Sequence, residues 1–226
     1  MLARGSSGAQ DQVDPAGRPP IEQAGDSTAA GMETAERTEP YLEWESSLAG
    51  LASAQGCVLV LGGTDTGKTT FSRLLVDRIL GSGGSAAILD ADVGQSEIGP
   101  PGTLGLELHS TGARAHAQNL AFLGATSPAG RLLHHAAAVR RLADSATVDR
   151  LVVDTPGYIT GSEARALIQA EFELLSPAHV VALQRGKELE AVLKPISMRK
   201  SCQVHRLPIP RVVQVRPAAL RAKRRE

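Results

Sequence analysis

Eight consecutive residues, 62–69, form a complete G-x-x-x-x-G-K-T phosphate loop with the sequence Gly-Gly-Thr-Asp-Thr-Gly-Lys-Thr. An apolar run at 57–61 precedes the loop and is typical of a parallel strand buried on both faces. After the loop, apolar residues recur at helical spacing from Phe71 to Ile79, and Gly81 begins a glycine-rich stretch that ends the pattern. Because this motif binds phosphates between a strand and a helix, the order predicts an α/β fold that binds a nucleoside triphosphate.

The loop residues have distinct predicted roles. We expect the backbone N–H groups of the loop and the positive end of the following helix to hold the phosphates. The Lys68 ammonium can reach the β- and γ-phosphate oxygens, and the Thr69 hydroxyl can ligate Mg²⁺. The predicted cofactors are therefore ATP or GTP, together with Mg²⁺. The predicted nucleotide-binding residues are Gly62, Gly63, Thr64, Asp65, Thr66, Gly67, Lys68, Thr69 and Thr70.

Strand-like and helix-like runs alternate in the rest of the chain. Strands separated by helices favour a parallel sheet with right-handed crossovers, and they place functional residues at the carboxyl ends of the strands. The predicted fold is therefore an α/β P-loop NTPase, with a mainly parallel sheet and helices on both faces. The predicted strands are 86–89, 120–123, 151–153 and 180–183, and the predicted helices are 132–142 and 163–175.

The first part of the chain has the composition of a disordered leader. Residues 1–40 are rich in Gly, Ser, Ala, Gln, Pro and acidic residues, and they have few large apolar side chains to bury. In 41–54, apolar residues such as Trp44 and Leu48 make one face of a short predicted helix. We interpret Trp44, the only tryptophan, as a packing anchor rather than a base-stacking residue. The folded P-loop domain is therefore predicted to be 41–210.

Two carboxylates, Asp90 and Asp92, follow the predicted strand at 86–89. In this kind of sheet they emerge beside the phosphate loop, and residues two positions apart point to the same side of a regular strand. One carboxylate could serve the Mg²⁺ shell while the other accepts a proton from an attacking hydroxyl. The spacing alone fits a pair of solvated aspartates equally well.

Charge is distributed unevenly along the chain. The net charge is zero, yet residues 194–226 contain ten Lys and Arg residues and one acidic residue. This asymmetry predicts that the basic end contacts an anion.

The sequence contains few signals for metal sites or membranes. Cys57 and Cys202 belong to no C-x-x-C motif or Cys/His cluster, which argues against structural zinc and favours a reducing, cytoplasmic location. His134 and His135 are predicted to be partly exposed rather than metal-binding, because adjacent residues on a helix diverge. No apolar stretch has the length of a membrane span, so we predict no membrane contact.

The stretch 90–102 reads D-A-D-V-G-Q-S-E-I-G-P-P-G. Placed downstream of the phosphate loop, it resembles the polynucleotide 5′-hydroxyl kinase family, which includes the RNA kinase of tRNA splicing and mRNA 3′-end formation and relatives acting on ribosomal RNA. The stretches 122–130, 152–158 and 174–185 agree with that family in order and spacing. The similarity runs from about residue 41 to the end and is greatest to single-domain prokaryotic members. It implies transfer of the γ-phosphate of ATP to the 5′-hydroxyl end of RNA, DNA or both.

The resemblance also implies roles for individual side chains near the loop. Lys68 and Thr69 match the phosphate-gripping lysine and the Mg²⁺-binding hydroxyl. Asp90 matches the metal-side acid of the family, and Asp92 matches its general base toward the terminal hydroxyl. Gln95 lies in the same loop, where it would be near substrate or metal.

Substrate contacts are implied at three further places. Thr126 and Ser127 match a turn that lines the substrate groove, although a plain Ser-Pro turn explains them almost as well. Tyr158 stands where many relatives have Trp as an aromatic clasp on the terminal base, and its smaller ring can still stack. Arg185 follows the predicted strand at 180–183 and is expected near nucleotide or substrate.

The basic end resembles the lid of the family. Arg216 and Arg221 have the R-x-x-x-x-R spacing of lid arginines, which close over the transferring phosphoryl group and stabilise its negative charge. A solvated basic helix is the alternative. Relatives continue this helix and append an accessory domain, so we expect the lid segment, 211–226, to be truncated.

Three other functions fit part of the sequence. The stretch 152–157 contains the D-x-x-G of a GTPase switch, but Asn119 is the only Asn and belongs to no N-K-x-D motif. The loop G-T-D-T-G-K-T resembles that of dethiobiotin synthetase-like enzymes, which would leave the D-x-D-x-G-Q stretch and the basic end unexplained. A family member could also bind ATP as an assembly scaffold with little turnover. The sequence identifies no protein partner.

Overall fold

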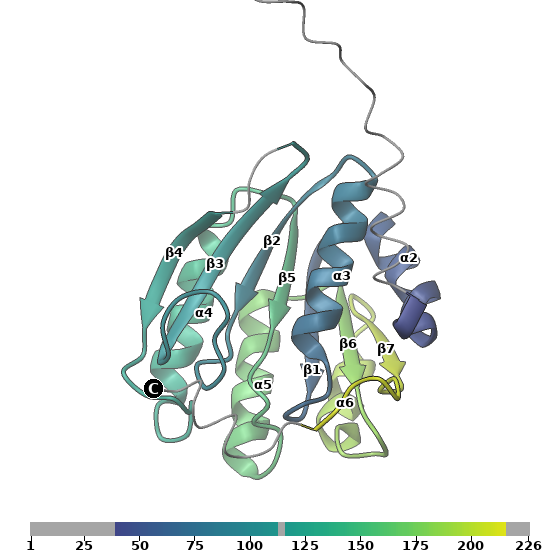
Figure 1. Cartoon of the computed structure of the whole chain (residues 1–226). Helices are drawn as coiled ribbons and strands as arrows, with labels where there is room; N and C mark the ends of the chain where they lie inside the picture. The colour runs from purple at the N-terminus through teal and green to yellow at the C-terminus, as the bar shows by residue number, and fades with distance from the viewer. Residues whose placement is uncertain (1–38, 113–115, 216–226) are drawn as a thin grey trace, which may run out of the picture.

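The computed structural model describes residues 39–112 and 116–215, which build one seven-stranded sheet flanked by helices (Figure 1). The strands are β1 (Gly56–Gly62), β2 (Ser85–Asp90), β3 (Thr103–Ser110), β4 (His116–Phe122), β5 (Arg150–Asp154), β6 (His179–Leu183) and β7 (Gln203–Leu207). The helices are the 3₁₀ helix η1 (Glu39–Trp44) and the α-helices α2 (Glu45–Ser53), α3 (Lys68–Gly81), α4 (Leu132–Asp144), α5 (Ser162–Leu175) and α6 (Glu190–Ser197).

The strand order is β4-β3-β2-β5-β1-β6-β7, and β2, β5, β1, β6 and β7 pair in parallel. Among the described strands, β3 is the one that runs opposite to all the others, since it pairs antiparallel with both β2 and β4. The predicted mainly parallel α/β fold is therefore confirmed. The order places β1 between β5 and β6, so the phosphate loop after β1 is flanked by the ends of two other parallel strands.

Helices cover both faces of the sheet, as predicted: α3 and α2 lie on one face, and α4, α5 and α6 lie on the other (Figure 1). Successive side chains of β1 point to opposite faces of the sheet, and both faces are covered by helices, which explains why its apolar run has no polar face. Leu59 and Leu61 belong to the apolar cluster under α4, α5 and α6, whereas Val58 and Val60 belong to the cluster under α3. Burial on both sides holds β1 at the centre of the domain, which anchors the loop that follows it.

Three elements were not predicted: β3, α6 and β7. The signal for β3 was present in the sequence, because Leu104 and Leu106 are fully buried and alternate with residues of the opposite face, as in an antiparallel strand. The strand predicted at 120–123 is the end of a longer strand, β4, which begins at His116 and forms a hairpin with β3. The α6 helix contains Pro195, which weakens its helical signal in the sequence.

Trp44 packs in the core beside the phosphate loop. Its side chain is fully buried, its indole N–H donates to the Pro208 carbonyl at 2.8 Å, and its ring meets Phe71 edge to face at 5.3 Å. The predicted packing role is thus confirmed, and burial rules out stacking on a base. Gly67 has a left-handed φ of 87°, and a Cβ built there would lie 2.9 Å from Trp44 Cη2. The indole therefore packs directly against the phosphate loop at Gly67.

The predicted leader, apart from its last two residues, and most of the predicted lid, including Arg216 and Arg221, lie outside the described residues. Within the described ranges, no helix combines the length and apolarity needed to cross a membrane.

Candidate active site at the phosphate loop

The phosphate loop is the turn between β1, which ends at Gly62, and α3, which begins at Lys68. The Thr66 hydroxyl donates to the Gly63 carbonyl at 2.9 Å and braces the turn. The Lys68 side chain is largely buried, and its Nζ donates to the same Gly63 carbonyl at 2.9 Å. Together with the free N–H groups at the start of α3, this arrangement is suited to holding an anion.

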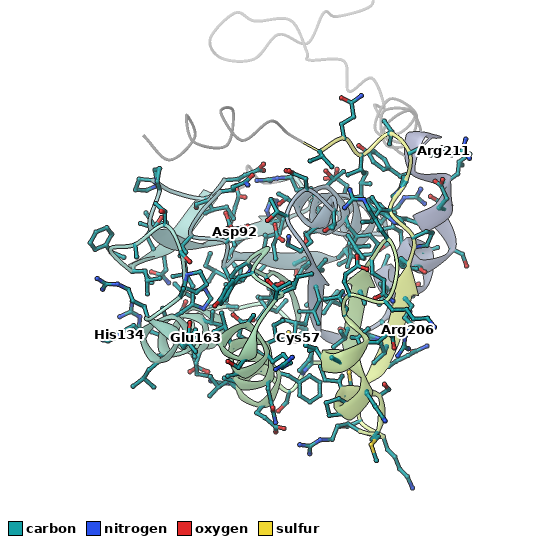
Figure 2. The ribbon with its side chains drawn as sticks, turned by 90° about the horizontal axis from the view of Figure 1, so that it is seen from below. Cys57, Asp92, His134, Glu163, Arg206 and Arg211 are labelled. Atoms are coloured by element: carbon teal, nitrogen blue, oxygen red, sulfur yellow. The ribbon has the colours of Figure 1, made fainter. Side chains whose placement is uncertain are left out.

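A depression in the protein surface opens at this loop. It is lined by Thr64, Asp65, Thr66, Gly67, Lys68, Thr69, Thr70, Asp92, Gln95 and Glu97. The structure thus brings all of the predicted loop residues except Gly62 and Gly63 into one depression with Asp92 and Gln95. Figure 2 looks onto this edge of the sheet and shows Asp92 near its middle.

Asp154, at the end of β5, was not among the predicted site residues. The Thr69 hydroxyl donates to Asp154 Oδ2 at 2.5 Å, and Asp154 Oδ1 is buried with no hydrogen-bond partner among the described residues. Burial raises the pKa of Asp154 to about 7, although the Lys68 charge opposes this shift, and the nearby Asp90 adds to it. A bound divalent cation would satisfy the orphaned oxygen and favour the charged carboxylate, so Thr69 and Asp154 could hold Mg²⁺.

A signal for Asp154 existed in the sequence, because an acid that ends an apolar strand next to β1 obeys the same rule that selected Asp90. The described residues contain no cluster of three or more His, Cys, Asp or Glu side chains that could hold a metal. This is compatible with Mg²⁺, which commonly uses one or two protein ligands together with phosphate oxygens and water.

Asp90 is buried at the end of β2 and organises the following loop. Its Oδ2 accepts the N–H groups of Glu97 at 2.6 Å and Ile98 at 3.1 Å, and its Oδ1 accepts the N–H of Asp92 at 3.1 Å. Burial raises the pKa of Asp90 to about 6 despite these hydrogen bonds. Both oxygens are engaged, and the contact with Thr69 is made by Asp154 rather than by Asp90. The metal-side role predicted for Asp90 stays a prediction, and the geometry favours Asp154 for it.

Asp92 is half-buried and has one carboxylate oxygen that is not used by its own loop. Its Oδ1 accepts the N–H groups of Gly94 at 3.0 Å and Gln95 at 3.2 Å, and no described hydrogen bond reaches Oδ2. The regular strand ends at Asp90, so the two aspartates do not share one strand face as their spacing suggested. Asp92 instead faces the depression at the phosphate loop, with a free oxygen suited to accepting a proton.

Other predicted substrate residues lie in the loops that follow β4 and β6. Thr126 and Ser127 are exposed in the loop after β4, where the Ser127 hydroxyl accepts the Ala129 N–H at 3.3 Å, as in a Ser-Pro turn. Arg185 follows β6 and its guanidinium donates to the Asp65 carbonyl at 3.1 Å, which places it at the rim of the loop as predicted. Neither Thr126 nor Ser127 lines the depression itself.

Tyr158 lies after β5 in a segment that passes against the phosphate loop. Its hydroxyl donates to Glu163 Oε2 at 3.2 Å, which fixes the half-exposed ring at the start of α5. Gly157 makes the close approach possible, since a Cβ built there would lie 2.7 Å from Thr64 Oγ1 and 2.9 Å from the Thr64 backbone nitrogen. Tyr158 does not line the depression, and its predicted contact with a base stays a prediction.

The structure agrees with the sequence about Asn119 and corrects it about His135. Asn119 lies on β4, where its amide donates to the Ser145 hydroxyl at 3.0 Å, so it cannot read a base at the phosphate loop. The prediction that both histidines of α4 are partly exposed is wrong for His135, which is fully buried, whereas His134 is exposed. Figure 2 shows His134 at the margin of the domain, away from Asp92.

Comparisons with known proteins agree with this site. A family model described as "mRNA cleavage and polyadenylation factor CLP1 P-loop" matches residues 62–226. The polyribonucleotide 5′-hydroxyl-kinase of Methanocaldococcus jannaschii is 35% identical over 144 residues, which cover 61% of this chain and 40% of that protein. The corresponding kinase of Pyrococcus abyssi is 34% identical over 143 residues, with coverages of 61% and 40%. The polyribonucleotide 5′-hydroxyl-kinase Clp1 of Gallus gallus is 31% identical over 129 residues, with coverages of 50% and 30%.

The fold has a counterpart among solved structures. A chain in the structure of the wild-type Clp1p–Pcf11p complex superposes with a TM-score of 0.62 at 15% identity, covering 81% of this chain and 50% of that one. The aligned part of this chain spans about two fifths of the length of the archaeal kinases. The resemblance inferred from the D-A-D-V-G-Q stretch is thus confirmed, and the P-loop of this family implies that the chain binds a nucleotide. Since the family model matches well over half of its residues, the chain belongs to the CLP1 P-loop family.

Proposed function

We propose that this chain is an ATP-dependent polynucleotide 5′-hydroxyl kinase that transfers the γ-phosphate to the 5′-hydroxyl end of RNA. The observation that carries the proposal is Asp92, whose free Oδ2 shares one depression with Lys68 and Thr69. A GTPase switch needs no such carboxylate, whereas attack by a hydroxyl does. The printed names of the archaeal relatives favour RNA over DNA as the acceptor.

The loop and its neighbours would bind and orient ATP. The backbone N–H groups of residues 63–68 and the start of α3 hold the phosphates, and Lys68 neutralises charge on the β- and γ-phosphate oxygens. Thr69 and Asp154 hold Mg²⁺, which when bound neutralises further phosphate charge. Burial of Asp154 beneath the loop supports this role, because a buried carboxylate is stabilised in its charged form by a nearby cation.

Asp92 would act on the acceptor. The 5′-hydroxyl oxygen attacks the γ-phosphorus while the bond from that phosphorus to the oxygen bridging to the β-phosphate breaks, and ADP leaves. Asp92 Oδ2 accepts the hydroxyl proton, and the hydrogen bonds from Gly94 and Gln95 to Oδ1 fix the direction of the carboxylate. Positioning and charge neutralisation supply most of the rate in this type of reaction.

The nucleic acid or the nucleotide would be bound around this centre by the remaining predicted residues, Gln95, Thr126, Ser127, Tyr158 and Arg185. Gln95 and Arg185 have the most direct support, because the first lines the depression and the second contacts the phosphate loop. Tyr158 would stack on the terminal base, and its anchored hydroxyl reduces the entropy lost on stacking.

The lid segment, 211–226, would complete the site with Arg216 and Arg221. The described part of this segment supports the proposal, because Val213 packs against the phosphate loop: a Cβ built on Gly67 would lie 3.2 Å from Val213 Cγ2. The predicted lid segment therefore begins beside the phosphate loop.

Changing Arg216 and Arg221 together to alanine is expected to lower the single-turnover rate far more than nucleotide affinity. An arginine that stabilises this transition state is worth about 10³ to 10⁵ in rate. Rates measured at saturating oligonucleotide separate this role from simple attraction, which would appear as weaker binding that shrinks with added salt. Arg199→Ala, an exposed arginine paired with Glu173 on the surface, is the control. A wild-type rate in the double variant would reject the lid assignment.

Asp154→Asn is expected to weaken the response to Mg²⁺. Asparagine can still accept the Thr69 hydrogen bond through its oxygen, but it removes the charge, which should lower Mg²⁺ affinity by about 10- to 100-fold. The transfer rate measured across a MgCl₂ titration tests this, with the exposed Asp144→Asn as the control for loss of a surface carboxylate. An unchanged Mg²⁺ concentration at half-maximal rate would instead favour Asp90 as the Mg²⁺ ligand.

One assay tests the proposal as a whole. The chain is incubated with Mg²⁺, γ-labelled ATP and a short 5′-hydroxyl RNA, and label on the RNA is expected. The matching DNA, the 5′-phosphorylated RNA and γ-labelled GTP define acceptor and donor preference, and the 5′-phosphorylated RNA should take no label. ATP binding without transfer to any acceptor would favour the scaffold alternative.

The remaining assignments follow from the same proposal. Residues 41–210 form the kinase domain, and the whole protein would act on 5′-hydroxyl RNA ends. Both cysteines, Cys57 and Cys202, are free thiols, which supports the predicted cytoplasmic location.

A further inference from the structure

His135 on α4 and Glu171 on α5 form a buried ionisable pair beneath the active-site edge. Both side chains are 0% exposed, and His135 Nδ1 lies 3.3 Å from Glu171 Oε1. Neither residue lines the depression at the phosphate loop. A buried ionisable pair is costly to desolvate and is weak evidence for stability, so its presence in a core of aliphatic side chains requires another explanation.

The pair reaches the active-site loop through one peptide unit. His135 Nε2 lies 2.9 Å from the carbonyl oxygen of Ala91, the residue between Asp90 and Asp92. The N–H of Ala91 donates to the Asp154 carbonyl at 2.9 Å. Ala91 is therefore held at its N–H by β5 and at its carbonyl by α4, together with the Val93 N–H at 3.1 Å, and the peptide so held leads directly into Asp92.

The hydrogen-bond chemistry specifies which proton the pair must carry. A carbonyl can only accept, so His135 Nε2 must bear a hydrogen. In a neutral imidazole of that form, Nδ1 would present a lone pair to the Glu171 carboxylate, which is repulsive. The pair must therefore hold one more proton, either as an imidazolium beside a carboxylate or as an imidazole beside a carboxylic acid.

The charges around His135 support this shared proton. Burial by itself lowers the pKa of His135, but the adjacent Glu171 carboxylate, the Ala91 carbonyl and the charge of Asp92 together raise it above its ordinary value. The groups that face His135 are Glu171 from α5 and Asp92 from the loop after β2. Glu171 thus fixes the form of the ring that donates to Ala91.

We propose that His135 and Glu171 are positioning residues that hold the Ala91 carbonyl and thereby aim Asp92 at the acceptor hydroxyl. The catalytic consequence rests on the proposed kinase function, whereas the control of the loop does not. Among the described residues, no side chain hydrogen-bonds to the Asp92 carboxylate, which accepts only backbone N–H groups of its own loop, while Asp90 Oδ1 accepts the Asp92 N–H. A small rotation of the Ala91 peptide would therefore move the general base.

The test uses variants that separate the tautomer argument from packing. Glu171→Gln introduces a side-chain N–H that can donate to Nδ1, so the ring still bears its hydrogen on Nε2. Glu171→Leu and His135→Leu keep comparable volume but remove the control of the ring or the ring itself. His134→Leu, the adjacent exposed residue on the same helix, is the matched control.

Single-turnover rates at saturating ATP and RNA give the catalytic readout. We expect His135→Leu and Glu171→Leu to lower the rate by about 10- to 100-fold, the scale of a misplacement of up to about 1 Å. ATP affinity should stay within about twofold, because the phosphate loop is not altered, and Glu171→Gln and His134→Leu should stay near the wild-type rate. Equal rates in all variants, or equal losses in Glu171→Gln and Glu171→Leu, would overturn the proposal.

Hydrogen exchange gives a readout that does not need kinase activity. Four backbone N–H groups of the loop donate hydrogen bonds to the Asp92 or Asp90 carboxylate: those of Gly94, Gln95, Glu97 and Ile98. We expect these amides to exchange faster in His135→Leu and Glu171→Leu, while the amides of α3 exchange at an unchanged rate. If the wild-type chain transfers no phosphate, the proposed function fails and this comparison alone decides the role of the pair. Unchanged exchange rates in residues 91–98 would overturn the proposal that the pair positions the loop. Should His135→Leu fail to fold, the comparison of Glu171→Gln with Glu171→Leu carries the same decision.

Discussion

Lys68→Ala is expected to reduce phosphoryl transfer below detection while the chain remains folded. Lys68 supplies the positive charge at the loop, and its Nζ donates only to the Gly63 carbonyl among described groups. Without substrate that hydrogen bond preorganises the ammonium at the mouth of the loop, and alanine removes both the charge and its position. Label transfer from γ-labelled ATP measures the loss, and thermal unfolding measures the fold.

The position of Lys68 adds one expectation to this variant. Although it belongs to a surface loop, Lys68 is only 6% exposed. Its aliphatic stem packs beneath the loop, so a small change in the unfolding temperature is expected besides the loss of transfer. Lys200→Ala, an exposed lysine before β7, is the control for removal of a positive charge. Normal transfer by a folded Lys68→Ala chain would remove the phosphate-loop mechanism.

Asp92→Asn is expected to lower the transfer rate by about 10² to 10⁴, the usual contribution of a general base, with little change in ATP affinity. The substitution is nearly isosteric, and its amide oxygen can still accept the Gly94 and Gln95 N–H groups that Oδ1 accepts now. The loop should therefore keep its shape while the free oxygen becomes an N–H₂ group that cannot take a proton. Single-turnover rates and ATP affinity measured on the same protein separate the two effects.

Asp90→Asn is the informative companion of that variant. Both oxygens of Asp90 accept hydrogen bonds from N–H groups of Asp92, Glu97 and Ile98, so an amide N–H₂ would face a donor in either orientation. We expect this variant to disturb the loop and lower stability, because unmade buried hydrogen bonds cost about 1–3 kcal/mol each. If Asp92→Asn transfers phosphate normally and a stably folded Asp90→Asn does not, the roles of the two aspartates are exchanged.

Short contiguous stretches of sequence were sufficient to predict the phosphate loop and most of the central strands and helices. The elements around residues 57–81 were predicted because a buried parallel strand, a glycine turn and an amphipathic helix each leave a local pattern. The antiparallel hairpin of β3 and β4 was missed because β3 was not predicted, although Leu104 and Leu106 alternate with residues of the opposite face. Local pattern identifies an element more readily than it identifies the partner of that element.

By itself, the sequence determined that this chain carries a P-loop domain. It also predicted the reactive side chains, Lys68 and Thr69 from the phosphate-loop motif and Asp92 from the resemblance to the kinase family. Only the tertiary structure decided which carboxylate meets Thr69 and what holds the Asp92 loop. Asp154 is 85 positions from Thr69, and His135 is 44 positions from Ala91. Such contacts depend on β5 lying between β1 and β2 and on the packing of α4 against α5, and no periodicity along the chain encodes strand order.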